Sequence, residues 1–255
     1  MNYELINMGA YNLHFIKTNR FKTITVEVDF RREIQKDDIT KRAVLKEALL
    51  NSNKNYKTER ELIIESENLY DLKLVASSAR MGNYINLSFK TRFLNEKYTE
   101  KNMNEESIAF LMDIIFNPNI ENGSFKEEVV NKCKNKIEKS IKSLKDSKLK
   151  YTLFKLLESV KDKPYSYNSY GYLEELEKID GKILYDYYND VISNDLIDIF
   201  IVGDFDSIEI KELIKKYFKA RTYHKSKTNI IVDELPIVKK INEQSEEDNV
   251  NQTQF

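Results

Sequence analysis

The sequence has very few residues of the kinds that usually carry catalysis: 255 residues contain two histidines, one cysteine, six glycines and no tryptophan. The histidines, His14 and His224, lie far apart, so no pair at helical spacing exists to hold zinc. A single cysteine, Cys133, excludes an internal disulfide and any site built from several cysteines. Gly203 has no second glycine at dinucleotide-binding spacing, which excludes a phosphate-cradling loop there.

Charge and hydropathy exclude further classes of partner. Lys and Arg number 41 against 42 Asp and Glu, so the formal net charge is -1 and favours neither nucleic acid nor an anionic membrane. No run of about 18 apolar residues spans a bilayer, and the N-terminus lacks the order of a signal peptide. With 41% apolar residues the chain has ample material for a core, and we expect it in the cytoplasm.

Hydrophobic periodicity predicts alternating groups of strands and helices. Residues 23–30 alternate, with Ile24, Val26, Val28 and Phe30 on one face, as in a half-buried antiparallel strand. The predicted strands are 11–17, 23–30, 72–78, 85–89, 196–202 and 230–232, and the predicted helices are 39–53, 58–69, 104–116, 124–141, 149–160 and 207–218.

Polar residues at the helix starts predict how these helices begin. Ser, Thr and Asp accept hydrogen bonds from the free N–H groups of a first turn, and a Glu three residues later completes a capping box. The predicted caps are Asp38, Thr58 with Glu61, Ser124 with Glu127, and Ser207.

Several reactive residue types have simple structural interpretations. His14 is predicted at an ordinary strand position and His224 in a solvated loop. Cys133 lies on the apolar seam of its helix, which predicts a packing residue and not a reactive thiol. The tyrosine-rich stretch 165–190 can stack on bases or grip a peptide, but its helical spacing favours packing against a core.

The helix at 39–53 carries Val44, Glu47 and Ala48 at the spacing where a zinc peptidase carries His, Glu and His. Zinc needs donors with electron pairs, and neither valine nor alanine has one. Of the three positions, Glu47 alone holds a polar residue. Without metal ligands beside it, we interpret Glu47 as solvated helix surface.

In their order, these motifs resemble the N-terminal half of the insulinase-like (pitrilysin, M16) zinc peptidases over about residues 3–220. The resemblance rests on the strand 23–30, the helix with Glu47, the hairpin 72–89, Phe-Asn-Pro at 116–118, the helix from 124, Tyr-Gly at 170–171 and IFIVGDFD at 199–206. FKT at 21–23 and LYDLKL at 69–74 are most similar to the catalytically deficient YfmF-type bacterial proteins, a subgroup associated with modification of translation elongation factor P. The resemblance to the M16 family implies an α+β fold, in which a mostly antiparallel sheet has helices on one side, as in LuxS and the mitochondrial processing peptidase.

The family carries His-x-x-Glu-His, whose slots fall here on Val44, Glu47 and Ala48. A register shifted back by one begins at Ala43, puts Lys46 in the base slot and Glu47 in the second histidine slot. In either register both histidines are absent, so the resemblance implies no catalytic residue and no metal, although active members hold zinc.

The family also has a distal metal ligand, which is a glutamate on a later helix. Its position in this chain depends on the alignment. Its slot falls near Cys133, while Glu127 or Glu128 fits a shifted alignment. One or two carboxylates without imidazoles make at best a weak oxygen site.

The family also binds extended peptides by adding them to a sheet edge beside the metal site. Carried over, that edge is Leu74, Val75, Ala76, Ser77 and Ser78. The alternative is that this strand is an inner or covered strand.

The domain expectation is an α+β domain over 1–220, followed at 221–255 by a flexible connector and the start of a second half, so that the chain is truncated. The predicted function is a catalytically inactive partner of an active zinc peptidase, either a separate M16 subunit or a second half, that contributes structure or a peptide-binding edge. The alternatives are an active insulinase-family metallopeptidase with a non-standard site, and a scaffold without peptide affinity.

Overall fold

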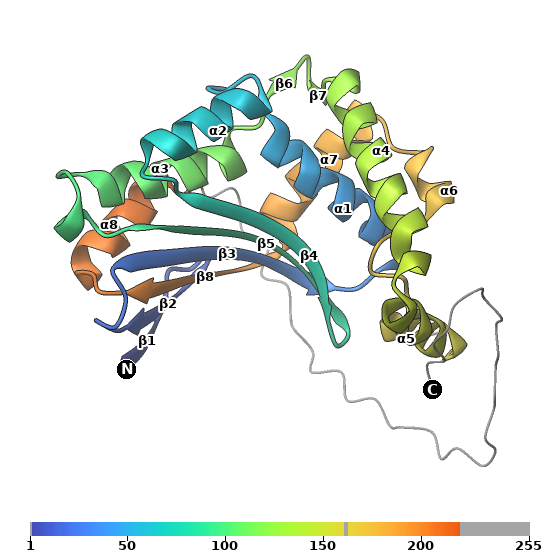
Figure 1. Cartoon of the computed structure of the whole chain (residues 1–255), viewed down its shortest axis with the longest axis horizontal. Helices are drawn as coiled ribbons and strands as arrows, with labels where there is room; N and C mark the ends of the chain where they lie inside the picture. The colour runs from blue at the N-terminus through green and yellow to red at the C-terminus, as the bar shows by residue number, and fades with distance from the viewer. Residues whose placement is uncertain (1, 161–162, 220–255) are drawn as a thin grey trace, which may run out of the picture.

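The computed structural model of the chain describes residues 2–160 and 163–219 (Figure 1). The predicted loop at His224, the strand at 230–232 and the connector 221–255 lie outside the described residues. The predicted boundary at residue 220 therefore stays a prediction.

A six-stranded sheet forms the base of the molecule, in the order β1-β2-β8-β3-β5-β4. Its neighbours are antiparallel except β2 and β8, which run parallel. The strands are β1 (Asn2–Asn7), β2 (Asn12–Lys17), β3 (Thr23–Glu33), β4 (Lys73–Met81), β5 (Tyr84–Leu94) and β8 (Leu196–Gly203). The mostly antiparallel α+β architecture predicted from the sequence is confirmed.

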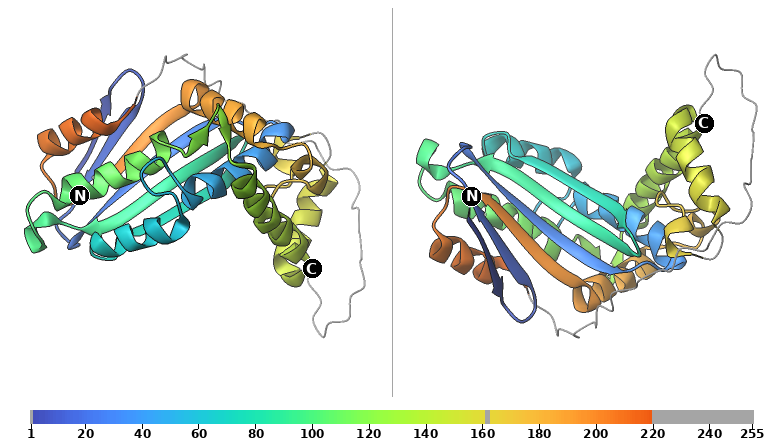
Figure 2. Two further views of the ribbon diagram at one scale, coloured as in Figure 1. Left: turned by 90° about the horizontal axis from the view of Figure 1, so that it is seen from above. Right: turned by 90° about the horizontal axis from the view of Figure 1, so that it is seen from below.

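Most of the helices cover one face of this sheet, as Figures 1 and 2 show. They are α1 (Lys36–Asn51), α2 (Glu59–Asn68), α3 (Met103–Phe116), α4 (Glu127–Lys142), α6 (Leu173–Leu176), α7 (Gly181–Asn194) and α8 (Ser207–Tyr217). Helix α5 (Lys148–Ser159) lies apart, and shorter pieces connect these elements: η1 (Glu96–Tyr98), η2 (Ser143–Asp146), η3 (Pro164–Ser166), β6 (Ile120–Glu121) and β7 (Ser124–Phe125).

The alternation of β3 gives the sheet its two faces. Ile24, Val26, Val28 and Phe30 are almost completely buried beneath the helices, as predicted. The other side chains of β3, including Thr25, Glu27 and Asp29, are only partly buried and belong to the opposite face, which we call the open face. Removing the helix-facing side chains from water is the main driving force for this layer.

Two helix starts differ from the predicted caps. Helix α1 begins earlier than predicted, after Gln35, so Asp38 lies inside its first turn, where its carboxylate pairs with Arg32 (3.3 Å). Helix α8 is capped by Asp206, which accepts hydrogen bonds from two backbone N–H groups of the first turn, while Ser207 is the first helical residue. Adjacent Asp and Ser both suit a cap, and here the carboxylate takes that position.

The capping box predicted at Ser124 is also wrong. Ser124 lies in β7 and its hydroxyl donates to the carbonyl of Phe125, while α4 begins after Lys126. The Glu127 carboxylate instead accepts a hydrogen bond from the Gly181 N–H (2.7 Å), a long-range partner that sequence spacing does not reveal. The cap at residue 58 is confirmed, because its hydroxyl accepts a hydrogen bond from the N–H of residue 61 (3.2 Å).

Candidate functional site

The three metal slots of the resemblance are filled by buried, apolar-packed side chains. Val44 and Ala48 lie on α1, Cys133 lies on α4, and all three belong to the hydrophobic core where these helices pack together. Burial raises the pKa of the Cys133 thiol to about 12, and the nearby Glu47 carboxylate adds to the effect. The prediction that Cys133 packs in the core is therefore confirmed.

Glu47 is not solvated helix surface, so that interpretation was wrong. Its side chain is only 10% exposed and both carboxylate oxygens are engaged by lysines. Lys136 of α4 places its Nζ 2.5 Å from one oxygen, and Lys46 places its Nζ 2.9 Å from the other. The sequence could not show this, because Lys136 reaches Glu47 only when α4 packs on α1.

The two lysines determine the protonation of this carboxylate. Burial by itself raises the pKa of Glu47, but the hydrogen bonds from Lys136 and Lys46 outweigh it and hold the pKa below its ordinary value. The pKa of Lys136 is raised, chiefly by its hydrogen bond to Glu47. The Glu47 carboxylate and the Lys136 ammonium group therefore stay ionised at neutral pH.

These residues do not fit a catalytic zinc ion. The slots at Val44 and Ala48 offer no electron pair, and the Glu47 carboxylate is already occupied by two ammonium groups. The Glu127 carboxylate already accepts a hydrogen bond from the N–H of Gly181 at the start of α7. Of the candidates for the distal ligand, Cys133 is the one that interacts electrostatically with Glu47. Within residues 2–160 and 163–219, no three His, Cys, Asp or Glu side chains converge to hold a metal.

Strand β4 lies at one edge of the sheet and, in the described part of the chain, pairs only with β5. A two-residue turn at Gly82 and Asn83 closes this hairpin, so Met81 and Tyr84 form its last hydrogen-bonded pair. The alternation of the ladder then directs the backbone N–H and C=O groups of every second residue away from β5. Those residues, on the unpaired side, are Leu74, Ala76 and Ser78.

The predicted edge residues are therefore of two kinds. Leu74 and Ala76 turn their side chains towards the core beneath α1, which contacts β4, and their backbone groups face the unpaired side. Val75 and Ser77 direct exposed side chains to the open face, and their backbone groups pair with β5. The structure thus places these residues on an edge strand next to the helix that carries Glu47.

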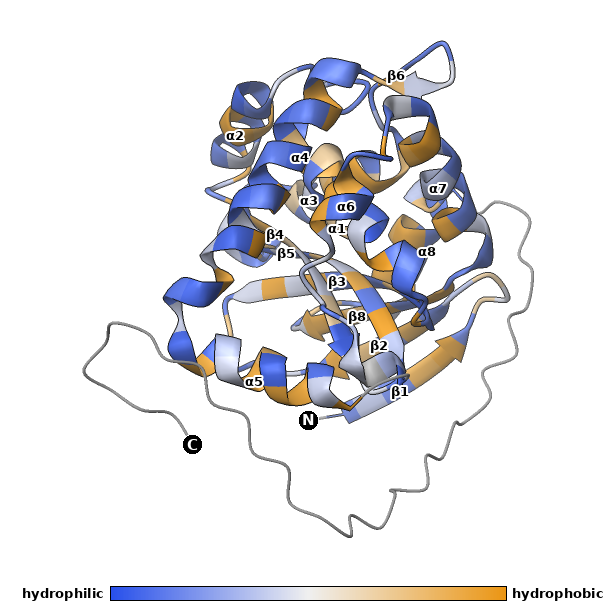
Figure 3. Cartoon of the chain, turned by 90° about the vertical axis from the view of Figure 1, so that its right-hand side faces the viewer, coloured by the Kyte–Doolittle hydropathy of each residue, from blue (hydrophilic) through white to orange (hydrophobic). Residues whose placement is uncertain are grey.

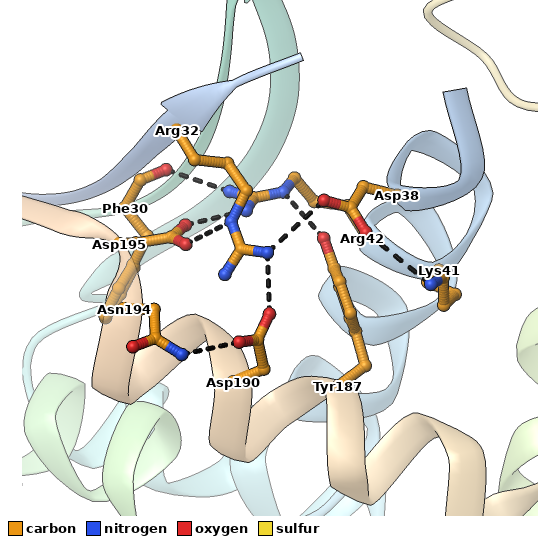
Figure 4. Close-up of polar contacts among 9 residues, drawn as sticks. All are labelled: Phe30, Arg32, Asp38, Lys41, Arg42, Tyr187, Asp190, Asn194 and Asp195. Atoms are coloured by element: carbon orange, nitrogen blue, oxygen red, sulfur yellow. Dashed lines mark hydrogen bonds and ion pairs between the residues drawn. The ribbon is translucent and has the colours of Figure 1, made fainter. Parts of the chain in front are cut away.

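A second ionic cluster, which was not predicted from the sequence, surrounds Arg42 of α1 (Figure 4). The side chains of Arg42 and Asp195 are both 0% exposed, and a guanidinium nitrogen of Arg42 lies 2.6 Å from a carboxylate oxygen of Asp195. Arg42 also donates to the carbonyl of Phe30 (3.0 Å) and to the hydroxyl of Tyr187 (3.1 Å). It thereby connects α1 to β3, to α7 and to the start of β8.

Arg32 extends this cluster from β3. Its guanidinium contacts the Asp195 carboxylate, lies 2.6 Å from Asp190 and reaches Asp38 as well. Two guanidinium groups thus face three carboxylates in the gap between β3, α1 and α7, as Figure 4 shows. Because each of these five charged groups has a partner of opposite charge, we assign the cluster to holding the fold together.

His14 lies on strand β2, as predicted, and its alternation with the buried Leu13 and Phe15 puts it on the open face. Its Nε2 is 3.1 Å from Asp198 and its Nδ1 is 2.9 Å from the hydroxyl of Tyr3. The predicted packing of the tyrosine-rich stretch is confirmed at Tyr187 and Tyr188, which are buried.

Comparison with known proteins agrees with this geometry. The family model described as "Peptidase M16 inactive domain" matches residues 178–255, across the predicted boundary at 220. The chain is 28% identical over 214 residues to the "Probable inactive metalloprotease YmfF" of Bacillus subtilis, with 83% of this chain and 50% of that protein covered. The chain is therefore similar to M16 peptidase-like proteins.

Solved structures show the same M16-like fold. A conserved protein from Enterococcus faecalis V583 is 25% identical, with a TM-score of 0.86 and coverage of 94% of this chain and 57% of that one. A peptidase M16 inactive domain from Pseudomonas fluorescens is 13% identical, with a TM-score of 0.67 and coverage of 89% and 53%. This M16-like chain therefore spans about half the length of the relatives it matches.

No helix among residues 2–160 and 163–219 is both long and apolar enough to cross a bilayer.

Proposed function

We propose that this M16-like chain is a catalytically inactive member of its family that serves as a structural and peptide-binding partner of an active zinc peptidase. The observation that carries the proposal is the pair of lysine ammonium groups on Glu47, in the place where the family's metal chemistry would be centred. A carboxylate held by two ammonium groups, beside Val44 and Ala48, has no means of activating water.

The unpaired side of β4 supports the peptide-binding part of the proposal. An extended peptide gains affinity from main-chain hydrogen bonds when it adds to a sheet edge. Leu74, Ala76 and Ser78 present such groups side by side, and α1 contacts the same strand. The partner is expected to be an M16 subunit, or a second half, that carries an intact His-x-x-Glu-His sequence.

The peptide-binding part is tested by Ala76→Pro. Proline removes the N–H that faces the unpaired side and leaves the hydrogen bonds to β5 in place, since an edge strand tolerates proline at such a position. Fluorescence polarisation with labelled, unstructured peptides should show binding to the wild type and to Ala76→Ser, which keeps the N–H, and none to Ala76→Pro. Equal binding by all three proteins, with unchanged circular dichroism, would remove β4 from the proposal. Absence of any binding by the wild type would favour a scaffold without peptide affinity.

The inactive part is tested by metal content and hydrolysis. Purified protein should contain no stoichiometric zinc and should not cleave casein. Stoichiometric zinc together with cleavage that Glu47→Gln abolishes would establish the alternative, an active metallopeptidase with a non-standard site.

The resemblance to the subgroup extends the proposal to modification of translation elongation factor P. This part rests on the subgroup and on no residue of the described chain. Mass spectrometry of the factor from a deletion strain tests it, and an unchanged modification would count against it.

A further inference from the structure

Helix α5 is the α-helix that contributes least to the core. Every other α-helix of the described residues buries at least one side chain, whereas α5 buries none. Figures 2 and 3 show it beyond the main body, on the side of the sheet that carries the open face. An isolated 12-residue helix is only marginally stable in water, and α5 has no fully buried side chain, so a further surface would stabilise it.

The side chains of α5 indicate what kind of surface fits. Leu149, Leu153 and Leu156 are 67%, 54% and 63% exposed, and their spacing of four and then three residues places them in one stripe. The aromatic residues of the helix, Tyr151 and Phe154, are instead half-buried, and their rings contact each other. We call Leu149, Leu153 and Leu156 the leucine stripe.

The narrowness of the leucine stripe favours a protein groove over a lipid surface. Helices that bind in grooves use anchors at spacings of three, four and seven residues, whereas helices that lie in a membrane present a broad apolar face with aromatic residues in it. Thr152 and Ser159 border the stripe on one side and the half-buried Leu157 borders it on the other, while helix geometry puts Tyr151 and Phe154 on another face.

Charge narrows the choice of partner further. Between residues 139 and 160 the chain has six lysines and two carboxylates, although the chain as a whole is nearly neutral. Such a local excess attracts an acidic surface and suppresses association with a basic one. The matching groove should therefore be apolar along its floor and carry carboxylates at its rim.

We propose that the leucine stripe of α5 docks into an apolar groove with an acidic rim on the active M16 peptidase subunit. This inference rests on the proposed function, which supplies the partner, and it adds the surface by which that partner is held. The relatives that the chain matches are about twice its length, which is consistent with a further half-sized body beside this one.

The test uses the full chain and the M16 subunit of the same genome that carries an intact His-x-x-Glu-His sequence. Isothermal titration calorimetry should show binding to the wild type that Leu153→Asp or Leu156→Asp weakens by roughly tenfold or more. The matched control is Ile208→Asp, because Ile208 is 76% exposed and lies on α8, at the opposite end of the molecule from α5 (Figure 1). Because these side chains are exposed, all three variants should fold, which circular dichroism checks. Added salt should weaken wild-type binding.

The other outcomes overturn the inference in distinguishable ways. Equal binding by wild type, Leu153→Asp and Ile208→Asp would remove α5 as the docking surface and leave the proposed partnership standing. No binding by the wild type would overturn the partnership, and the inference with it. Binding of the wild type to phosphatidylglycerol vesicles that Leu153→Asp abolishes would make the stripe a membrane contact. A dimer of the chain alone that Leu153→Asp dissociates in sedimentation velocity would make it a contact between copies.

Discussion

Two ionic groups on the same helix, α1, differ in how far they are removed from water. Arg42 is completely buried and its partner Asp195 is buried with it, whereas Glu47 is bound by Lys136, whose side chain is 65% exposed. The first group connects four elements of the fold, and the second joins two helices where the family has its metal motif. A charge buried from water depends entirely on its partner, while a charge at the rim retains water as an alternative.

The difference shows what occupies the positions that the resemblance assigns to a metal site. In place of a divalent ion and its ligands, the α1–α4 contact has one carboxylate, two ammonium groups and an apolar floor formed by Val44, Ala48 and Cys133. That arrangement neutralises Glu47 without any donor set for zinc. Its loss should therefore cost much less stability than loss of the Arg42 cluster.

The largest effect is expected for Asp195→Ala, which leaves the buried Arg42 without its carboxylate. Removing one partner of a buried pair costs about 3–5 kcal/mol of unfolding free energy. Urea denaturation at neutral pH measures this loss. The control is Asp190→Ala, because Asp190 is 43% exposed and its loss should cost less than about 1 kcal/mol. Equal losses would show that the Arg42 cluster is not a buried anchor of the fold.

A smaller effect is expected at the former metal site. Glu47→Gln should lower the unfolding free energy by about 1 kcal/mol, because Lys136 is 65% exposed and keeps water as a partner. Combined with Lys136→Met in a double-mutant cycle, it should give a coupling of about 0.5–1 kcal/mol. Zero coupling would mean that Lys136 does not hold Glu47 in solution.

The pH dependence of stability, compared between the wild type and Glu47→Gln, tests the lowered pKa of Glu47. A carboxyl whose pKa is lowered by folding binds fewer protons in the folded state, so its contribution is complete above its unfolded value of 4.5 and is lost as pH falls through the folded value. Between about pH 5 and pH 3, the wild type should therefore lose more thermal stability than Glu47→Gln. Parallel curves for the two proteins would contradict the lowered pKa.

The smallest effect concerns Cys133, which lies next to Glu47 on the apolar side of the same contact. With its pKa raised to about 12, the thiol should react with Ellman's reagent at pH 8 at least roughly a hundredfold more slowly in native protein than in urea. Cys133→Ser gives the blank. Fast reaction of the native thiol would show that the α1–α4 contact opens readily.

Much of the fold followed from local patterns in the sequence. The alternation of 23–30 predicted both the strand and its buried face, and Thr58 predicted the cap of α2, because each depends on neighbours a few residues away. Strand β1 was not predicted, because a six-residue segment whose only aliphatic residues are Leu5 and Ile6 gives a weak period, and its side chains are almost all exposed. Three of the predicted caps were wrong, because α1 begins before Asp38, Ser124 lies in a short strand, and Asp206 caps α8 in place of the neighbouring Ser207.

What the sequence determined by itself is the loss of the metal motif: aliphatic side chains at residues 44 and 48 cannot donate an electron pair in any fold. Only the tertiary structure decided how Glu47 is neutralised, that Arg42 and Asp195 meet, and that β4 is an edge. Ligand chemistry belongs to each side chain, whereas ion pairs and sheet edges depend on which distant segments pack together.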